Sequence, residues 1–115
     1  MGHQVGDEDT AIALGSGDVP VLATPRLIAW LEAATVRAAE AFVRAGQTSV
    51  GTAIRIEHRR ATAVGGTVEV SATPLTAVDG RRLTFTVRAT DGSGQVVADG
   101  EIDRVLVDRA RFLSG

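Results

Sequence analysis

Cysteine, lysine, tyrosine and asparagine are absent from this 115-residue sequence. Without cysteine, the chain has no disulfide, no cysteine zinc site and no thiolate nucleophile. Without lysine, it has neither a Schiff-base amine nor the lysine of a phosphate-binding P-loop. The groups left for chemistry are carboxylates, hydroxyls, arginines and two histidines. His3 lies near the N-terminus, where chains usually fray, so His58 is the candidate catalytic imidazole.

Excess charge and long apolar runs are also absent. The formal net charge is -2, which leaves no basic surplus to bind a nucleic-acid backbone. No apolar run approaches the roughly 18 residues of a membrane span, and the acidic first ten residues do not resemble a signal peptide. A chain of this length can bury one core. We therefore expect a single cytoplasmic domain over residues 1–115, with no nucleic-acid or membrane partner.

One long helix is predicted after a short strand. The apolar stretch from Thr10 to Leu14 indicates that strand, and a glycine-containing loop follows it. Thr24 and Pro25 are typical of an N-cap residue and of the first helical position. The segment from Arg26 to about Ala45 is rich in helix-forming residues, and Gly46 is typical of the residue that ends a helix.

Four strands are predicted after the helix. The first has an alternating pattern that places one set of side chains on a common face, namely Val50, Thr52, Ile54 and Ile56. The remaining predicted segments are a strand from Thr67 to Val78, a turn at Asp79-Gly80, a strand from Arg82 to Ala89, and a strand from about Gln95 to Asp108. Short turns between these strands favour antiparallel pairing.

The order of these elements predicts an α+β fold of the hot-dog type. A sheet with one apolar face and a helix with one apolar stripe must cover each other. The simplest arrangement is one long central helix packed on a five-stranded antiparallel sheet. Because a single helix covers five strands thinly, leftover apolar surface favours pairing of two copies, and we expect a homodimer.

Two polar residues fall on faces that should be apolar. On a helical wheel Glu32 projects about 120° away from the centre of the arginine-rich solvent face. His58 continues the predicted apolar face of its strand. The residues alone leave two interpretations open. Either Glu32 reaches water or an arginine and His58 is structural, or the two converge as a general acid/base pair between helix and sheet.

Arg104 is a weaker anomaly of the same kind. It lies in phase with Ile102 and Leu106 on the last strand. Val105 and Val107 make the opposite face apolar as well, so the pattern does not decide which face is buried. A structural ion pair is the favoured interpretation of this arginine.

Three segments carry a resemblance to a known family: VLATPRLIAWLEAATVRAA, SVGTAIRIEHRRATAVGGTVEVSA and DGRRLTFTVRATDG. They resemble the hot-dog thioesterases of the fluoroacetyl-CoA thioesterase type, over about Val19 to Val107. The resemblance implies a catalytic set of threonine, glutamate and histidine, at the motif positions held here by Thr24, Glu32 and His58. It further implies functional roles for Gly51 and Arg104.

The activity implied is hydrolysis of a small acyl-CoA or a related acyl thioester. Glu32 would attack the carbonyl carbon or activate water, His58 would carry the proton, and Thr24 would orient the nucleophile or donate to the carbonyl oxygen. The backbone N–H near Gly51 could bind the oxyanion. No metal or cofactor is needed beyond the coenzyme A of the substrate. Its phosphates could be bound by Arg26, Arg59 or Arg60.

Several alternatives remain open at this point. Thr24 could serve as the helix cap instead of as a catalytic group. The chain could also be a binding module that holds a thioester or another apolar ligand without turnover, or a hot-dog dehydratase. The fluoroacetyl-specific member of the family that the chain resembles has a longer segment with lid phenylalanines before the helix. The loop from Gly15 to Val21 is short here and has no phenylalanine, so the resemblance does not imply selectivity for fluoroacetyl-CoA. The acyl group, and the choice between CoA and acyl carrier protein, are not determined.

Overall fold

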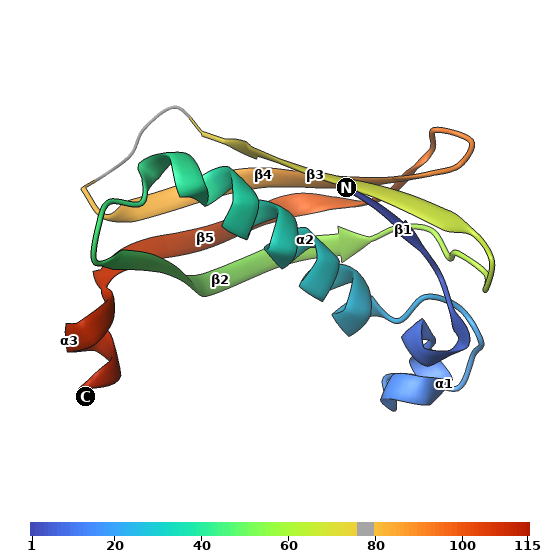
Figure 1. The fold of residues 1–115 in the computed structure, drawn as a ribbon. Coiled ribbons are helices and arrows are strands. Elements are labelled where there is room, and N and C mark those ends of the chain that lie inside the picture. Colours follow the sequence, from blue (N-terminus) through green and yellow to red (C-terminus); the bar gives the residue numbers. More distant parts are fainter. Residues whose placement is uncertain (76–79) are drawn as a thin grey trace.

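One long helix lies across a twisted antiparallel sheet in the computed structural model, which describes residues 1–75 and 80–115 (Figure 1). Helix α2 spans Thr24–Ala39. The strands are β1 (Gly2–Gln4), β2 (Gln47–His58), β3 (Thr67–Pro74), β4 (Arg82–Asp91) and β5 (Val96–Asp108). They are hydrogen-bonded in the order β1-β3-β4-β5-β2, and all neighbours run antiparallel. The predicted arrangement of one helix on five strands is confirmed.

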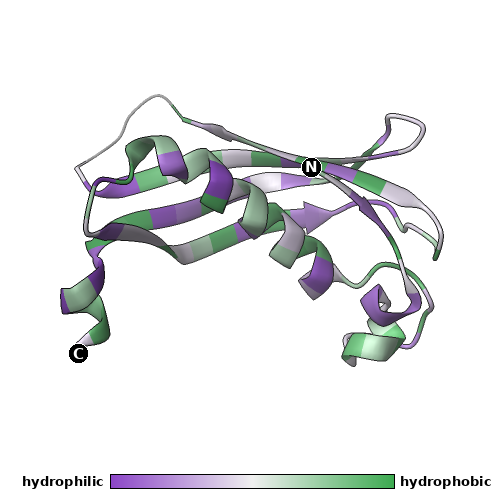
Figure 2. Cartoon of the chain, in the orientation of Figure 1, coloured by the Kyte–Doolittle hydropathy of each residue, from purple (hydrophilic) through white to green (hydrophobic). Residues whose placement is uncertain are grey.

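The core lies between α2 and the concave face of the sheet. Leu27 and Leu31 of α2 are fully buried, as are Phe85 of β4 and Ile102 of β5. Along β4 every second residue from Leu83 to Ala89 is buried and the residues between are more exposed, as the alternation predicts. Figure 2 shows the corresponding change between hydrophobic and hydrophilic colours along the strands. This packing fixes which face of α2 meets the sheet.

The N-terminal segment differs from the prediction. Residues Ala11–Leu14 form a short helix, α1, whereas a strand was expected there. Thr10 caps this helix, because its Oγ1 accepts a hydrogen bond from the N–H of Ala13 at 3.2 Å, and Gly15 ends it with a φ of 70°. A 3-10 turn at Asp7–Asp9 precedes it. The first strand is β1, which the sequence pattern did not indicate.

Helix α2 ends earlier than predicted. The chain tightens into a 3-10 turn at Glu40–Phe42, and Val43 is already extended. Phe42 and Val43 pack against the core from these conformations. The predicted helical residues up to Ala45 are therefore partly a loop, because tertiary packing of two apolar side chains outweighs local helix propensity.

Strand β2 contains a β-bulge that changes the predicted face pattern. Gly51 pairs with Arg104 and Ala53 pairs with Asp103, so Thr52 is an extra residue between them. After the bulge, Ile56 and His58 lie on the helix side as predicted, because Ile56 packs against the core and His58 contacts Thr24. Before it, the order is reversed: Gly51 faces the helix, and the expected placement of Val50 and Thr52 on that face is wrong. An extra residue shifts the two-residue side-chain period by one position.

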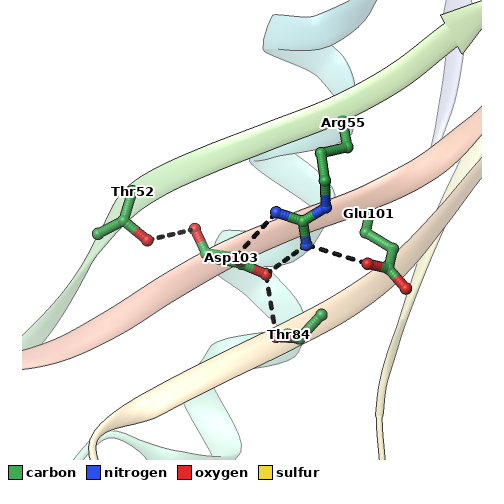
Figure 3. A network of polar contacts seen from close by, with 5 residues as sticks. All are labelled: Thr52, Arg55, Thr84, Glu101 and Asp103. Carbon is green, nitrogen blue, oxygen red and sulfur yellow. Dashed lines mark hydrogen bonds and ion pairs between the residues drawn. The ribbon is translucent and has the colours of Figure 1, made fainter.

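Figure 3 shows a polar network on the sheet face away from α2, next to this bulge. Arg55 donates hydrogen bonds to both carboxylate oxygens of Asp103, at 2.9 and 3.0 Å, and to Glu101 at 3.0 Å. Thr84 donates to Asp103 at 2.9 Å, and Thr52 donates to the Asp103 carbonyl oxygen. The Arg55 guanidinium lowers the pKa of Asp103. The network therefore links β2, β5 and β4 where the backbone pairing is irregular.

The remaining strand predictions hold with shifted ends, and the C-terminal residues differ from the prediction. Strand β3 ends at Pro74, while the predicted strand end at Val78 and the turn residue Asp79 lie outside the described residues. The residues after β5, for which the sequence pattern predicts no element, form a short helix, α3 (Arg109–Leu113), capped by Asp108. Within residues 1–75 and 80–115, no helix combines the length and the apolar character needed to cross a bilayer.

Gly100 should be essential for pairing β5 with β2. Its φ is 153°, and a Cβ atom at this position would overlap the backbone carbonyl of Arg55 on β2. We expect Gly100→Ala to lower the free energy of unfolding by at least about 2 kcal/mol, because strain and backbone displacement add. The matched control is Gly94→Ala, at a turn glycine with a φ of 84° and open space, where about 1 kcal/mol is expected. Equal losses in urea denaturation would contradict the close-approach argument.

Candidate active site

The first polar pair of the site lies where the start of α2 meets the end of β2. Thr24 is the first residue of α2 and His58 is the last residue of β2. Thr24 Oγ1 and His58 Nδ1 are 2.8 Å apart and share a hydrogen bond. The N–H groups of Arg59 and Arg60 both donate to the Val97 carbonyl, which holds this end of β2 on β5. The sequence prediction that His58 faces the helix is thus supported by a direct contact.

Thr24 does not cap the helix. The N-cap residue is Ala23, and no side chain at that position bonds to the helix N-terminus. The Thr24 hydroxyl instead points to His58. The capping interpretation is therefore wrong, and the helix begins one residue earlier than the Thr24-Pro25 pattern indicates. The start of α2 is held by main-chain contacts, among them the hydrogen bond from the Ala23 N–H to the Asp9 carbonyl at 2.8 Å.

Burial changes the protonation behaviour of His58. Desolvation disfavours the imidazolium and lowers the pKa of His58 from its ordinary value of 6.5. The neutral ring is the form that can accept a proton from a hydroxyl or a water molecule. The environment therefore keeps His58 available as a base over a wider pH range than an exposed histidine.

A second polar cluster lies two turns further along α2. Glu32 Oε2 is 4.0 Å from Nη1 of Arg104, whose side chain is 7% exposed. Arg104 therefore faces the helix, which resolves the ambiguity of its strand, and it forms the expected ion pair. Its guanidinium also donates to the Ser49 hydroxyl at 2.9 Å and to the Ser49 carbonyl at 3.0 Å, with Thr35 Oγ1 at 3.5 Å. These contacts fix the positive charge beside Glu32.

Gly51 leaves space for the Glu32 carboxylate. A Cβ atom on Gly51 would lie 2.9 Å from Glu32 Oε2 and 3.6 Å from Arg104 Nη1. The Glu32 side chain is 37% exposed, so it reaches both the arginine and solvent. The fully apolar surroundings that the helical wheel suggests for Glu32 are not present in one chain.

The two clusters do not meet within one chain. Thr24 and Glu32 are eight residues apart, which is a rise of about 12 Å on a helix. Gly51 and His58 are seven residues apart, which is about 20 Å along a strand. In the part of the chain that the structure describes, no hydrogen bond or ion pair joins Glu32 to His58. The predicted convergence of these two side chains is therefore not achieved inside a single copy.

Thr24 and His58 open onto a cavity of about 280 Å³. Residues from α1, from the loop before α2 and from the segment after β2 line the cavity, among them Ser16, Arg59 and Arg60. The charged residues of the cavity thus belong to the segment that follows His58 in the sequence. In the described ranges, no group of three or more histidines and carboxylates is arranged to hold a metal ion.

Comparison with known proteins assigns the chain to a family. Residues 5–110 match the family of the fluoroacetyl-CoA-specific thioesterase. The chain belongs to this family. The curated fluoroacetyl-CoA thioesterase of Streptantibioticus cattleyicolor is 38% identical over 92 residues, which are 80% of this chain and 65% of that protein. The match thus spans just under two thirds of the relative. The resemblance stated from the sequence is confirmed.

Solved structures confirm the hot-dog fold. A variant of the fluoroacetyl-CoA-specific thioesterase, in complex with fluoroacetate and CoA, superposes with a TM-score of 0.88 at 31% identity. The alignment covers 99% of this chain and 92% of that chain. A hot-dog-like protein from Thermanaerovibrio acidaminovorans has a TM-score of 0.87 at 22% identity, with 99% and 83% of the two chains covered. At that identity, the second likeness shows the fold alone.

Sequence reasoning missed the residues that hold Arg104. Ser49 was not considered, because the bulge that places it on the helix-facing side has no sequence signature here. Thr35 did have a sequence signal, because it is a hydroxyl residue in an alanine-rich stretch, three residues after Glu32; the structure buries it fully. Its hydroxyl donates to the Glu32 carbonyl at 2.7 Å and so connects Arg104 with the backbone of the candidate catalytic residue.

Because the Thr24 hydroxyl contacts His58 and does not cap the helix, removing this hydroxyl should affect activity more than stability. We expect Thr24→Ala to lower turnover at least about tenfold, which corresponds to about 1.4 kcal/mol in the activation barrier. The melting temperature should change little, because no helix cap is lost, and Thr24→Ser should retain most activity. Thr10→Ala is the matched stability control, since Thr10 is a true cap, and it should cost about 1 kcal/mol. A large loss of stability in Thr24→Ala with normal turnover would contradict this role.

The lowered pKa of His58 predicts where activity falls at acid pH. Protonation removes the base, so kcat/KM should decrease as the pH falls through the His58 pKa, with a midpoint below 6.5. NMR titration of the imidazole C–H signals gives the same pKa directly. The variant His3→Gln removes one of the two histidine signals, so the signal that remains belongs to His58. His3 stacks on Trp30, away from the Thr24–His58 pair, so this variant leaves the pair intact. A titration of His58 at or above 6.5 would show that burial does not control this ring.

Proposed function

We propose that this protein hydrolyses a small acyl-CoA thioester, with Thr24, Glu32 and His58 as the catalytic residues. The observation that carries the proposal is the 2.8 Å contact between Thr24 and His58 beside an open cavity, in a chain of an acyl-CoA thioesterase family. A relative's structure holds fluoroacetate and CoA, an acid and a thiol of the kind that such a hydrolysis releases. Selectivity for the fluoroacetyl group is not part of the proposal.

The chemistry needs a nucleophile, a proton carrier and a partner for the oxyanion. Glu32 attacks the thioester carbonyl, or it activates a water molecule that does so. The C–S bond breaks as the CoA sulfur departs, and an anhydride formed by direct attack is then hydrolysed by water. In either route neutral His58 accepts the proton that the reacting water molecule gives up and passes it to the CoA sulfur. Thr24 orients the nucleophile beside the imidazole of His58. The backbone N–H near Gly51, where no side chain blocks approach, stabilises the oxyanion.

The site is completed in this proposal by a second copy of the chain. Strand β2 is an edge strand, so one side of its backbone has no strand partner within the described part of the chain. Ile54 in its middle is 41% exposed. Pairing two β2 strands antiparallel about a two-fold axis brings the His58 end of each strand beside the Gly51 end of the other. Thr24 and His58 of one copy then approach Glu32 and Arg104 of the second.

The remaining assignments stay predictions of the sequence. In the proposed reaction, the chain acts as a single hot-dog domain in the cytoplasm. It requires no metal and no cofactor other than the CoA of its substrate. Neither a nucleic acid nor a membrane takes part. The homodimer is the assembly on which the completed site depends.

Mixed dimers test the activity and the shared site together. Glu32→Gln and His58→Ala should each lower turnover of a panel of small acyl-CoA thioesters by at least about 100-fold. When the two variants are refolded together at equal amounts, half of the dimers are mixed and each has one intact site. The mixture should then recover about a quarter of wild-type turnover, measured as free thiol, with dimers confirmed by light scattering.

Three outcomes would contradict the proposal in different ways. A mixture as inactive as each variant would place all catalytic residues in one chain. A wild-type protein that binds acyl-CoA without turnover would be a binding module. Full activity of Glu32→Gln would remove the glutamate from the mechanism.

A further inference from the structure

One arginine beside the Thr24–His58 pair has no charged partner among residues 1–75 and 80–115. Three arginines were candidates for binding the phosphates of CoA. Arg26 is 3.0 Å from Asp9, and Arg59 is paired with Asp99 at 2.9 Å and with Glu57 at 3.2 Å. Arg60 forms no ion pair or side-chain hydrogen bond with any residue in the ranges 1–75 and 80–115, although it lines the same cavity as His58.

The surroundings of Arg60 explain why its charge stays available. The positive charge of Arg60 interacts electrostatically with the carboxylate of Asp91. Asp91 Oδ1 already accepts hydrogen bonds from the Ser93 N–H, the Ser93 hydroxyl and the Gln95 N–H. The Ser93 hydroxyl, and to a smaller extent the charge of Arg60, lower the pKa of Asp91. Asp91 is thus hydrogen-bonded within its own turn, and within the described residues it forms no direct ion pair with Arg60.

The backbone of Arg60 is nevertheless held in place. Its N–H donates to the Val97 carbonyl at 3.2 Å, next to the corresponding bond of Arg59 at 2.7 Å. An unpaired guanidinium on a fixed backbone, two residues from the candidate base, can bind an anion without first breaking an ion pair. A phosphate oxygen is a ligand that suits the planar guanidinium.

We infer that Arg60 binds a phosphate group of the CoA carrier and so favours CoA thioesters over thioesters without phosphate. This inference rests on the proposed function of the cavity. The acyl group must enter the cavity for its carbonyl to reach His58, whereas the hydrophilic carrier stays towards solvent. Arg60 is exposed at the cavity. Its charge therefore meets the carrier and not the acyl group.

The test compares one acyl group on two carriers, CoA and pantetheine, which has no phosphate. Arg60→Gln should raise KM for the acyl-CoA about three- to tenfold with little change in kcat, and should leave KM for the acyl-pantetheine unchanged. The difference should shrink at about 1 M salt, where surface charges are screened within about 3 Å. Arg60→Lys should restore part of the affinity. Arg37→Ala, an exposed arginine of α2 outside the cavity, is the charge-matched control and should not change KM.

Binding of CoA alone, measured by calorimetry, keeps the inference testable without turnover. Arg60→Gln should weaken CoA binding by the same factor as it raises KM. Equal KM increases for both carriers, or unchanged CoA binding in Arg60→Gln, would overturn the inference and leave the proposed hydrolysis intact. Absence of turnover in the wild type, with CoA binding that depends on Arg60, would instead overturn the proposed hydrolysis alone.

Discussion

The packing of α2 on the concave face of the sheet is the constraint on which the site depends. Leu27 and Leu31 are fully buried, so the rotation of the helix about its axis is set by apolar contacts. Glu32 follows Leu31 directly and is thereby turned towards the edge formed by β5 and β2. Thr24, at the start of the same helix, is placed against the end of β2. One hydrophobic interface thus positions two polar side chains about 12 Å apart.

The β-bulge in β2 makes the second cluster possible. Without the extra residue at Thr52, the side of the strand that carries His58 would carry Val50 and Thr52 towards the helix. With it, Gly51 faces Glu32, and the missing side chain provides the space for the carboxylate. The ladder is irregular at this point, and the outer-face network of Arg55 and Asp103 bridges the strands there. A polar surface cluster and a glycine on the inner face are therefore two consequences of one inserted residue.

The charges of the site differ in how strongly they are held. Arg104 is buried, and its guanidinium is fixed by Ser49 and Glu32, so it acts as a permanent positive charge beside the carboxylate. Arg60 is exposed and has no charged partner in the described part of the chain, so it can respond to a ligand. His58 lies between these extremes, because its burial favours the neutral ring. The same residue types therefore perform different tasks according to burial and pairing.

The sequence by itself determined the long helix, the four strands after it, and the two residues whose polarity conflicts with their faces, Glu32 and His58. These features depend on local periodicity, which can be read from one segment of sequence without information about the segments that pack against it. Tertiary structure decided the remainder. Ala23 instead of Thr24 became the N-cap because the Thr24 hydroxyl has a partner 34 residues away. Residues Ala11–Leu14 became a helix, and Gly2–Gln4 joined the sheet. The bulge at Thr52 and the contact of Arg104 with Glu32 arise from pairing between distant strands, and a one-residue shift in such pairing leaves no trace in the hydrophobic pattern of one strand.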